Sequence, residues 1–90
     1  MPSKDQIDKV WSKAKQIKGE DPNKYRQDPY GNRIRKDAYG KETAQGWEVD
    51  HIKPASRGGS DSLHNLQALQ TSVNRSKGDS LVKKSRHNQR

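Results

Sequence analysis

The fold of this chain is decided by a segment that reads GWEVDHIKP over residues 46–54, RGGS over 57–60, HNLQ over 64–67 and NRSK over 74–77. The stretch over 47–52 is the best candidate for a strand, and a second short strand is predicted over 66–69. The stretch over 53–62 between them is rich in Pro, Gly and Ser, as is typical of a loop.

A short helix is expected directly after the second strand. Thr71 or Ser72 is suited to cap its first turn, and the helix is predicted to run to about Lys77, with Gly78 closing it. Two strands, a loop and a helix therefore form a central unit at about residues 46–79, and the expected fold class is α+β.

The same segment carries residue types that suit phosphodiester hydrolysis. Asp50 and His51 are adjacent on the first strand, and asparagines follow at positions 65 and 74. Cleaving a phosphodiester requires a base to activate water, a cation to neutralise charge, and positive groups to hold the backbone. These side chains and the nearby lysines and arginines can supply all three.

In their order, these pieces resemble an HNH endonuclease. DHI and P, then GG, then NLQ, and finally NxxK occur between Trp47 and Asp79 in the order and at distances like those of that family. The resemblance implies a ββα-metal core in a small, cysteine-free, stand-alone member. It also implies a metal-dependent endonuclease that nicks or cuts double-stranded DNA.

The resemblance gives each motif position a role. His51 corresponds to the general base that deprotonates the attacking water, and histidine titrates close to neutral pH. Asp50 corresponds to a metal ligand, and Asn65 to the middle asparagine that braces the loop and helps to orient the base. Asn74 takes the last motif position, as the second protein ligand of the metal. The catalytic motif positions are thus His51, Asn65 and Asn74.

The last motif position, often a histidine in this family, is Asn74 here. This shifts the coordination toward oxygen from carboxylate, amide, phosphate and water. Mg²⁺ or Mn²⁺ suits such ligands better than Zn²⁺. One magnesium or manganese ion per site is therefore the expected cofactor.

Other side chains are candidates for contact with the metal or the substrate. Glu48 alternates with Asp50 along the strand, although pairing with a surface base suits it equally well, and His64 is adjacent to Asn65. Either is a possible metal or phosphate contact. Contacts with the DNA backbone are expected from the basic residues Lys53, Arg57, Arg75 and Lys77.

The proposed roles carry one geometric condition. Successive side chains of a flat strand point to opposite faces, so Asp50 and His51 would not reach the same phosphate. Lys53 precedes Pro54, and the glycine-rich loop begins nearby, which favours a local distortion. The sequence therefore predicts a sharp bend or twist of the strand at Asp50 and His51.

The residues before this segment are expected to add a helix and a hairpin. Residues 3–18 are predicted to form an amphipathic helix with a Ser3 and Gln6 capping box and Gly19 just past its end. The apolar stripe of this helix comprises Ile7, Val10, Trp11, Ala14 and Ile17. After a loop over residues 20–28, a tight turn from Tyr30 to Arg33 is expected to join short strands that contain Ile34 and Tyr39.

Composition indicates one small domain. Of the 90 residues, 26% are hydrophobic and 33% charged, and none is cysteine. We expect one domain over residues 1–82 and a flexible basic tail over 83–90. In many relatives, zinc knuckles formed by cysteines support this core. Because this chain has no cysteine, the support must come from the N-terminal helix, Trp47 and the tyrosines, or from a second copy in a homodimer. A bound metal should also add to stability.

A net charge of +8 favours a polyanionic partner. No long apolar stretch suggests a membrane, and no signal-peptide pattern is seen, so a cytoplasmic location is expected. Two alternatives stay open: a non-catalytic basic DNA-binding module with an HNH-like fold, and an RNA-directed nuclease or toxin-like fragment. Nicking and double-strand cutting are not distinguished, because one site cuts one strand.

Overall fold

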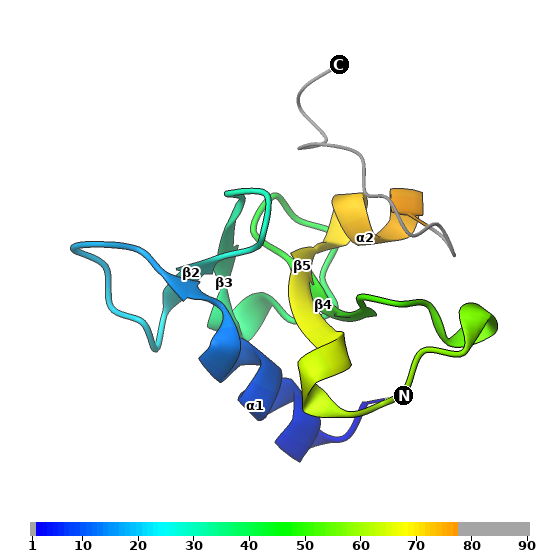
Figure 1. The fold of residues 1–90 in the computed structure, drawn as a ribbon. Coiled ribbons are helices and arrows are strands. Elements are labelled where there is room, and N and C mark those ends of the chain that lie inside the picture. Colours follow the sequence, from blue (N-terminus) through cyan, green and yellow to red (C-terminus); the bar gives the residue numbers. More distant parts are fainter. Residues whose placement is uncertain (1, 78–90) are drawn as a thin grey trace.

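The computed structural model describes residues 2–77, which form two small antiparallel sheets and two helices (Figure 1). The elements are α1 (Lys4–Lys13), β1 (Lys15–Gln16), β2 (Tyr25–Gln27), β3 (Arg33–Arg35), η1 (Lys36–Ala38), β4 (Trp47–His51), η2 (Ala55–Arg57), η3 (Leu63–Asn65), β5 (Leu66–Gln70) and α2 (Thr71–Lys77), where η marks a single 3-10 turn. The fold is α+β, as predicted. Gly78 and the tail over 83–90 lie outside the described residues. No helix within residues 2–77 has both the length and the apolar character needed to cross a bilayer.

Helix α1 begins where the sequence predicts and ends sooner. The Ser3 hydroxyl accepts the Gln6 backbone N–H at 3.1 Å, and the Gln6 side chain accepts the Ser3 N–H at 3.0 Å, so the capping box is confirmed. The predicted extension to residue 18 is wrong, because Ala14 is extended (φ −67°, ψ 152°) and β1 follows it. The Arg26 guanidinium donates to the Ala14 carbonyl at 3.0 Å, which provides a hydrogen-bond partner just beyond the end of α1.

The hairpin also departs from the prediction. Part of the expected loop over residues 20–28 is strand β2, which pairs with β3. Ile34 lies on β3 as predicted and is fully buried. Tyr39 lies on no hairpin strand; it forms an isolated bridge with Trp47. Gly19 (φ 85°) lies in the turn between β1 and β2 rather than at the end of α1.

A buried aspartate organises the turn between β2 and β3. Asp28 is 2% exposed, and its Oδ1 accepts the backbone N–H groups of Tyr30 and Asn32 at 2.9 Å each. Its Oδ2 accepts the Asn32 amide at 3.0 Å and the Gln70 backbone N–H at 3.0 Å. The turn is therefore tied both to itself and to the end of β5.

The two strands and the helix of the central unit form as predicted. Strand β4 ends at His51, and all of it pairs with β5, which leads directly into α2 (Figure 1). The cap of α2 differs from the expected Thr71 or Ser72. Gln70 takes that position, because its Oε1 accepts the Val73 backbone N–H at 3.1 Å.

The β4–β5 pair has two faces of different character. The α1 face carries Trp47, Val49, Leu66 and Ala68, with His51 at its end, and the α2 face carries Glu48, Asp50, Gln67 and Leu69. On the α1 face, Val10 and Trp11 of α1 pack against the strands, and the rings of Trp11 and Trp47 lie 5.2 Å apart. On the α2 face, Asn74 of α2 donates a hydrogen bond to Glu48. The core therefore lies mainly on one face, and α2 covers the other.

Candidate active site

One buried asparagine closes the loop between β4 and β5. Asn65 is 9% exposed, its Oδ1 accepts the Lys53 N–H at 2.9 Å, and its Nδ2 donates to the Ser60 carbonyl at 2.7 Å. The Asn65 carbonyl accepts the Ile52 N–H at 2.8 Å. Asn65 thus joins the beginning of the loop to its end, and its polar side-chain atoms are engaged in doing so.

Two glycines allow this loop to fold back on itself. Gly58 has a φ of 87°, in the left-handed region that favours glycine. A Cβ atom at Gly59 would lie 1.8 Å from the Lys53 carbonyl oxygen. The Gly58 and Gly59 N–H groups donate to the carbonyls of Ala55 and Pro54 at 3.0 and 2.9 Å. The loop is therefore stabilised by its own backbone.

His51, at the end of β4, contacts an acid from this loop. Its Nε2 lies 2.7 Å from Asp61 Oδ1, and the two side chains are 33% and 80% exposed. When Nε2 carries the proton and donates it to Asp61, Nδ1 is the nitrogen that accepts a proton. Sequence reasoning gave Asp61 no role. The only available signal was an acid within a Gly- and Ser-rich loop.

Asp50 is the buried acid of the α2 face. It is 6% exposed, and its Oδ2 accepts the Gln67 side-chain amide at 2.8 Å from the opposite position on β5. Burial, followed by the negative charges of Asp50 and Asp28, raises the pKa of the Tyr30 phenol. Tyr30 and Gln67 therefore belong to the surroundings of Asp50, although sequence reasoning assigned neither to the site.

A polar network around Glu48 fastens α2 to β4. Asn74 Nδ2 donates to Glu48 Oε1 at 2.9 Å, and Arg75 donates to Glu48 Oε2 at 3.0 Å and also pairs with Glu42. Burial raises the pKa of Glu48, but hydrogen bonds from Arg75 and Asn74 and the charge of Arg75 bring it below its usual value. Because its amide nitrogen is held by Glu48, Asn74 turns its carbonyl oxygen away from that carboxylate.

Asp50 and His51 lie on opposite faces of β4. The ladder continues without an inserted residue through the pairs Asp50↔Gln67 and His51↔Leu66, and the chain bends only at residues 52–53. The predicted distortion at Asp50 and His51 is therefore wrong, because regular pairing with β5 preserves the alternation of side chains. The structure does not bring the expected base and the expected ligand to one face.

Asp50 and Asn74 offer the atoms that Mg²⁺ or Mn²⁺ prefers. Both lie toward the α2 face, since Asp50 follows Glu48 by two positions, about 7 Å along the strand, and Asn74 is bonded to Glu48. Within residues 2–77 there is no cluster of three His, Cys, Asp or Glu side chains suited to a metal. A carboxylate and an amide oxygen, completed by water and phosphate, fit an ion that retains several water molecules.

The other expected contact residues lie between β4 and β5 or on α2. Lys53, Arg57 and His64 are exposed in the segment that joins β4 to β5. Arg75 is engaged with two glutamates, and Lys77 is the last residue of α2. The structure therefore places Arg75 in the network that holds α2, and leaves three of the candidates on the solvent side of the loop.

The chain matches the model of a known protein family. A family model described as HNH endonuclease matches residues 28–82, which is more than half of the chain. The match includes the turn that contains Asp28 and Tyr30 as well as β4, β5 and α2. None of the curated proteins and none of the solved structures that were compared matches the chain.

Proposed function

Because this chain belongs to the HNH endonuclease family, we propose that it is a metal-dependent endonuclease that hydrolyses phosphodiester bonds of double-stranded DNA. Membership of the family indicates a nuclease in general, and the substrate, the metal and the residue roles are our proposal. The observation that carries it is the contact between His51 and Asp61 at the end of the strand that bears buried Asp50.

In this proposal His51 is the general base. His51 is the last residue of β4, so a phosphate that lies across the end of the strand meets His51 from one face and the ligands around Asp50 from the other. With Nε2–H donated to Asp61, Nδ1 accepts a proton from the water that attacks phosphorus. The nearby carboxylate of Asp61 fixes the tautomer and stabilises the imidazolium that results, as an acid does for the base of a catalytic triad. Asp61 is therefore a positioning residue, since it acts through His51.

Asp50 and Asn74 would hold the divalent ion through carboxylate and amide oxygens. When bound, the ion supplies positive charge to the phosphate and the leaving oxygen. Gln67 orients the Asp50 carboxylate by donating to Oδ2, and Glu48 orients the Asn74 amide by accepting from Nδ2. Such outer partners commonly determine how well ligands bind a metal.

Electrostatics supports a nucleic acid substrate. The chain carries a net charge of +8. Lys53 and Arg57 are exposed in the segment between β4 and β5, which also contains Asp61. Cations at such positions can neutralise backbone phosphates and release counterions, which makes the affinity fall steeply with salt. In the proposal these two residues hold the DNA beside His51.

A plasmid assay tests this function. Supercoiled plasmid incubated with Mg²⁺ or Mn²⁺ should become nicked and then linear, and EDTA should prevent both changes. His51→Ala should slow cleavage by about 10²–10⁴-fold, whereas Lys24→Ala, an exposed site before β2, should not. Asp61→Asn should lower kcat more than it raises KM. Equal cleavage by His51→Ala and the wild type would contradict the mechanism.

A non-catalytic DNA-binding module is the second candidate, and one observation favours it. Asp50 and His51 lie on opposite faces of β4, and binding alone does not require them to share a phosphate. Tight, salt-sensitive binding with intact DNA recovered in the presence of several divalent ions would support this alternative. Cleavage of single-stranded RNA but not of duplex DNA would instead identify an RNA-directed nuclease.

A further inference from the structure

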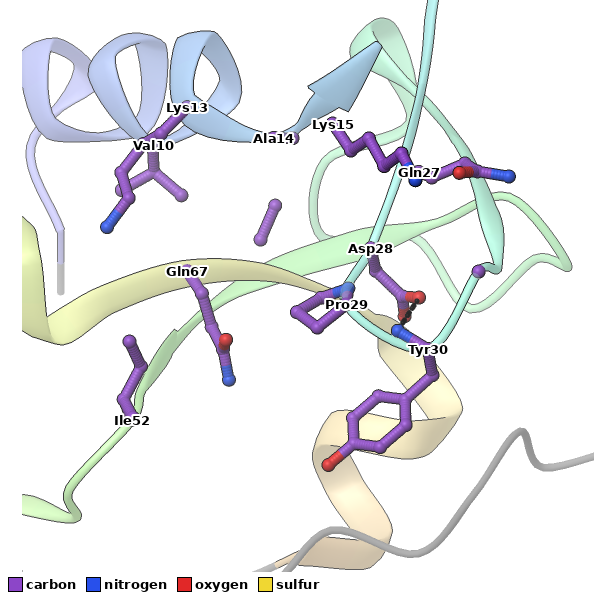
Figure 2. A pocket seen from close by; sticks show the side chains of 12 residues that line it. Val10, Lys13, Ala14, Lys15, Gln27, Asp28, Pro29, Tyr30, Ile52 and Gln67 are labelled. Carbon is purple, nitrogen blue, oxygen red and sulfur yellow. Dashed lines mark hydrogen bonds between the residues drawn. The ribbon is translucent and has the colours of Figure 1, made fainter. Parts of the chain in front are cut away.

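A groove of about 630 Å³ follows the outer edge of β5, between the end of α1 and the turn over residues 28–32 (Figure 2). We call it the β5 groove, and its lining includes Lys13, Lys15, Tyr30, Ile52, Gln67 and Ala68. Sites for small organic ligands commonly occupy about 300–1,000 Å³. The β5 groove is therefore large enough for one nucleotide.

The floor of the groove presents backbone groups of β5. The Leu66 carbonyl accepts the Lys13 ammonium at 2.6 Å and the Gln70 N–H donates to Asp28 at 3.0 Å, so both groups point away from β4. In an antiparallel pair, every second residue turns its N–H and C=O outward. Ala68 lies midway between Leu66 and Gln70, so its N–H and C=O also point toward the groove. A donor and an acceptor side by side match the edge of a nucleobase.

The walls suit the remaining parts of a nucleotide. Tyr30 offers an aromatic ring, and Ile52 is 44% exposed although it is apolar. Aromatic and apolar side chains are the surfaces on which unpaired bases stack. Lys15 at the rim is exposed, and within residues 2–77 it makes no recorded ion pair, so its charge is available to a phosphate.

The groove adjoins the proposed metal site. Gln67 lines it and also donates to the Asp50 carboxylate at 2.8 Å. Tyr30 is held in place by the turn that Asp28 organises, and in the view of Figure 2 its ring lies below Gln67. A base bound there would belong to a nucleotide close to the bond that is cut.

We propose that the β5 groove binds one unpaired nucleobase of the substrate strand beside the scissile phosphate. The inference rests on the proposed nuclease function, because it takes the substrate of that site as the ligand. A paired base must leave its stack to enter a groove, and this costs least at a mismatch or bulge. The chain should therefore prefer duplexes that carry an unpaired nucleotide.

The test measures binding by the His51→Ala protein in Mg²⁺, so that cleavage does not intervene. Its ligands are a fluorescent duplex with a one-nucleotide bulge and the same duplex with an abasic nucleotide in the bulge. We expect the bulged base to tighten binding roughly tenfold, the scale of one base–aromatic stack. Tyr30→Ala should remove this difference, while the matched Tyr25→Ala, on β2, should retain it.

A second variant keeps the test valid if Tyr30→Ala does not fold. Lys15→Gln should weaken binding of the bulged duplex more than Lys18→Gln, which removes the same charge from the turn after β1. The Ala68 amide resonance should shift with the bulged duplex and not with the abasic one. Equal binding of the two duplexes would overturn the proposal, as would a base preference that survives in the Tyr30 and Lys15 variants.

This result is separable from the outcome of the plasmid assay. A base preference lost in the groove variants, in a protein that cuts no plasmid, would support the groove and contradict the nuclease function. Cleavage by a protein without any base preference would support the nuclease function and contradict the groove.

Discussion

The two faces of the β4–β5 pair are built from alternate residues of the same strands, yet they differ in character. The α1 face is apolar, and Trp47 there lies between the rings of Trp11 and Tyr39, at 5.2 and 4.9 Å. The α2 face carries Glu48 and Asp50, which are joined to α2 and to β5 by side-chain hydrogen bonds. One face therefore stabilises the domain, while the other is left for polar chemistry.

His51 is a polar residue at one end of the α1 face. It lies at the end of that face, where the core stops and the loop begins, and there it meets Asp61. Its position lets it act in chemistry without a part in the core. If stability and chemistry separate in this way, substitutions in the core should change the stability, and substitutions at His51 or on the α2 face should change the chemistry.

The largest expected effect is the loss of cleavage activity in His51→Ala. Loss of a general base should lower kcat by about 10²–10⁴-fold. The melting temperature should change little, because the side chain contacts the loop rather than the core. Plasmid cleavage rates and thermal melts would measure the two quantities. A large fall in stability would show that His51 belongs to the structural face after all.

Truncation of the core on the α1 face should act on stability. Trp47→Ala removes a side chain that is 1% exposed and should cost about 3–5 kcal/mol in the free energy of unfolding. Urea denaturation would measure the change, with Leu63→Ala, which is 41% exposed, as the control. If both variants lost the same stability, the core would not be centred on Trp47.

Truncation on the α2 face should act on the metal. Asn74→Ala and Asp50→Ala should each raise the Kd for Mn²⁺ about 10–100-fold. His51→Ala should raise this Kd less than either of them. Titration calorimetry would measure the Kd, with Ser76→Ala on α2 as the control. Saturating Mn²⁺ should raise the melting temperature of the wild type and have little effect on Asn74→Ala. Unchanged Mn²⁺ affinity in Asn74→Ala would exclude it as a ligand.

The smallest effect concerns the acid that holds α2. The pKa of Glu48 is lowered in the folded state, so its contribution to stability is present above the unfolded value of about 4.5 and is lost as the pH falls through the folded value. Wild type and Glu48→Gln, melted in EDTA, should differ by a few degrees at pH 7, because the network is partly exposed. The difference should shrink below about pH 4.5. A constant difference would assign the effect to packing instead of charge.

The sequence by itself determined the elements that depend on local patterns. The short strand-like stretches over 47–52 and 66–69 indicated β4 and β5, and Ser3 with Gln6 located the start of α1. The motif from Asp50 to Asn74 indicated the family, which the match over residues 28–82 supports. Such features rest on residues a few positions apart, so they can be recognised before the chain is folded.

Only the tertiary structure decided the features that depend on distant residues. Arg26 meets the end of α1, and Asp28 ties a turn to Gln70. Asp61 reaches His51 across the loop, an approach that no local pattern specifies. The expected bend at His51 is absent, because hydrogen-bonded pairing with β5 holds each residue of β4 in the regular alternation. The identity of the chemical groups was thus in the sequence, while their placement on two faces came from strand pairing.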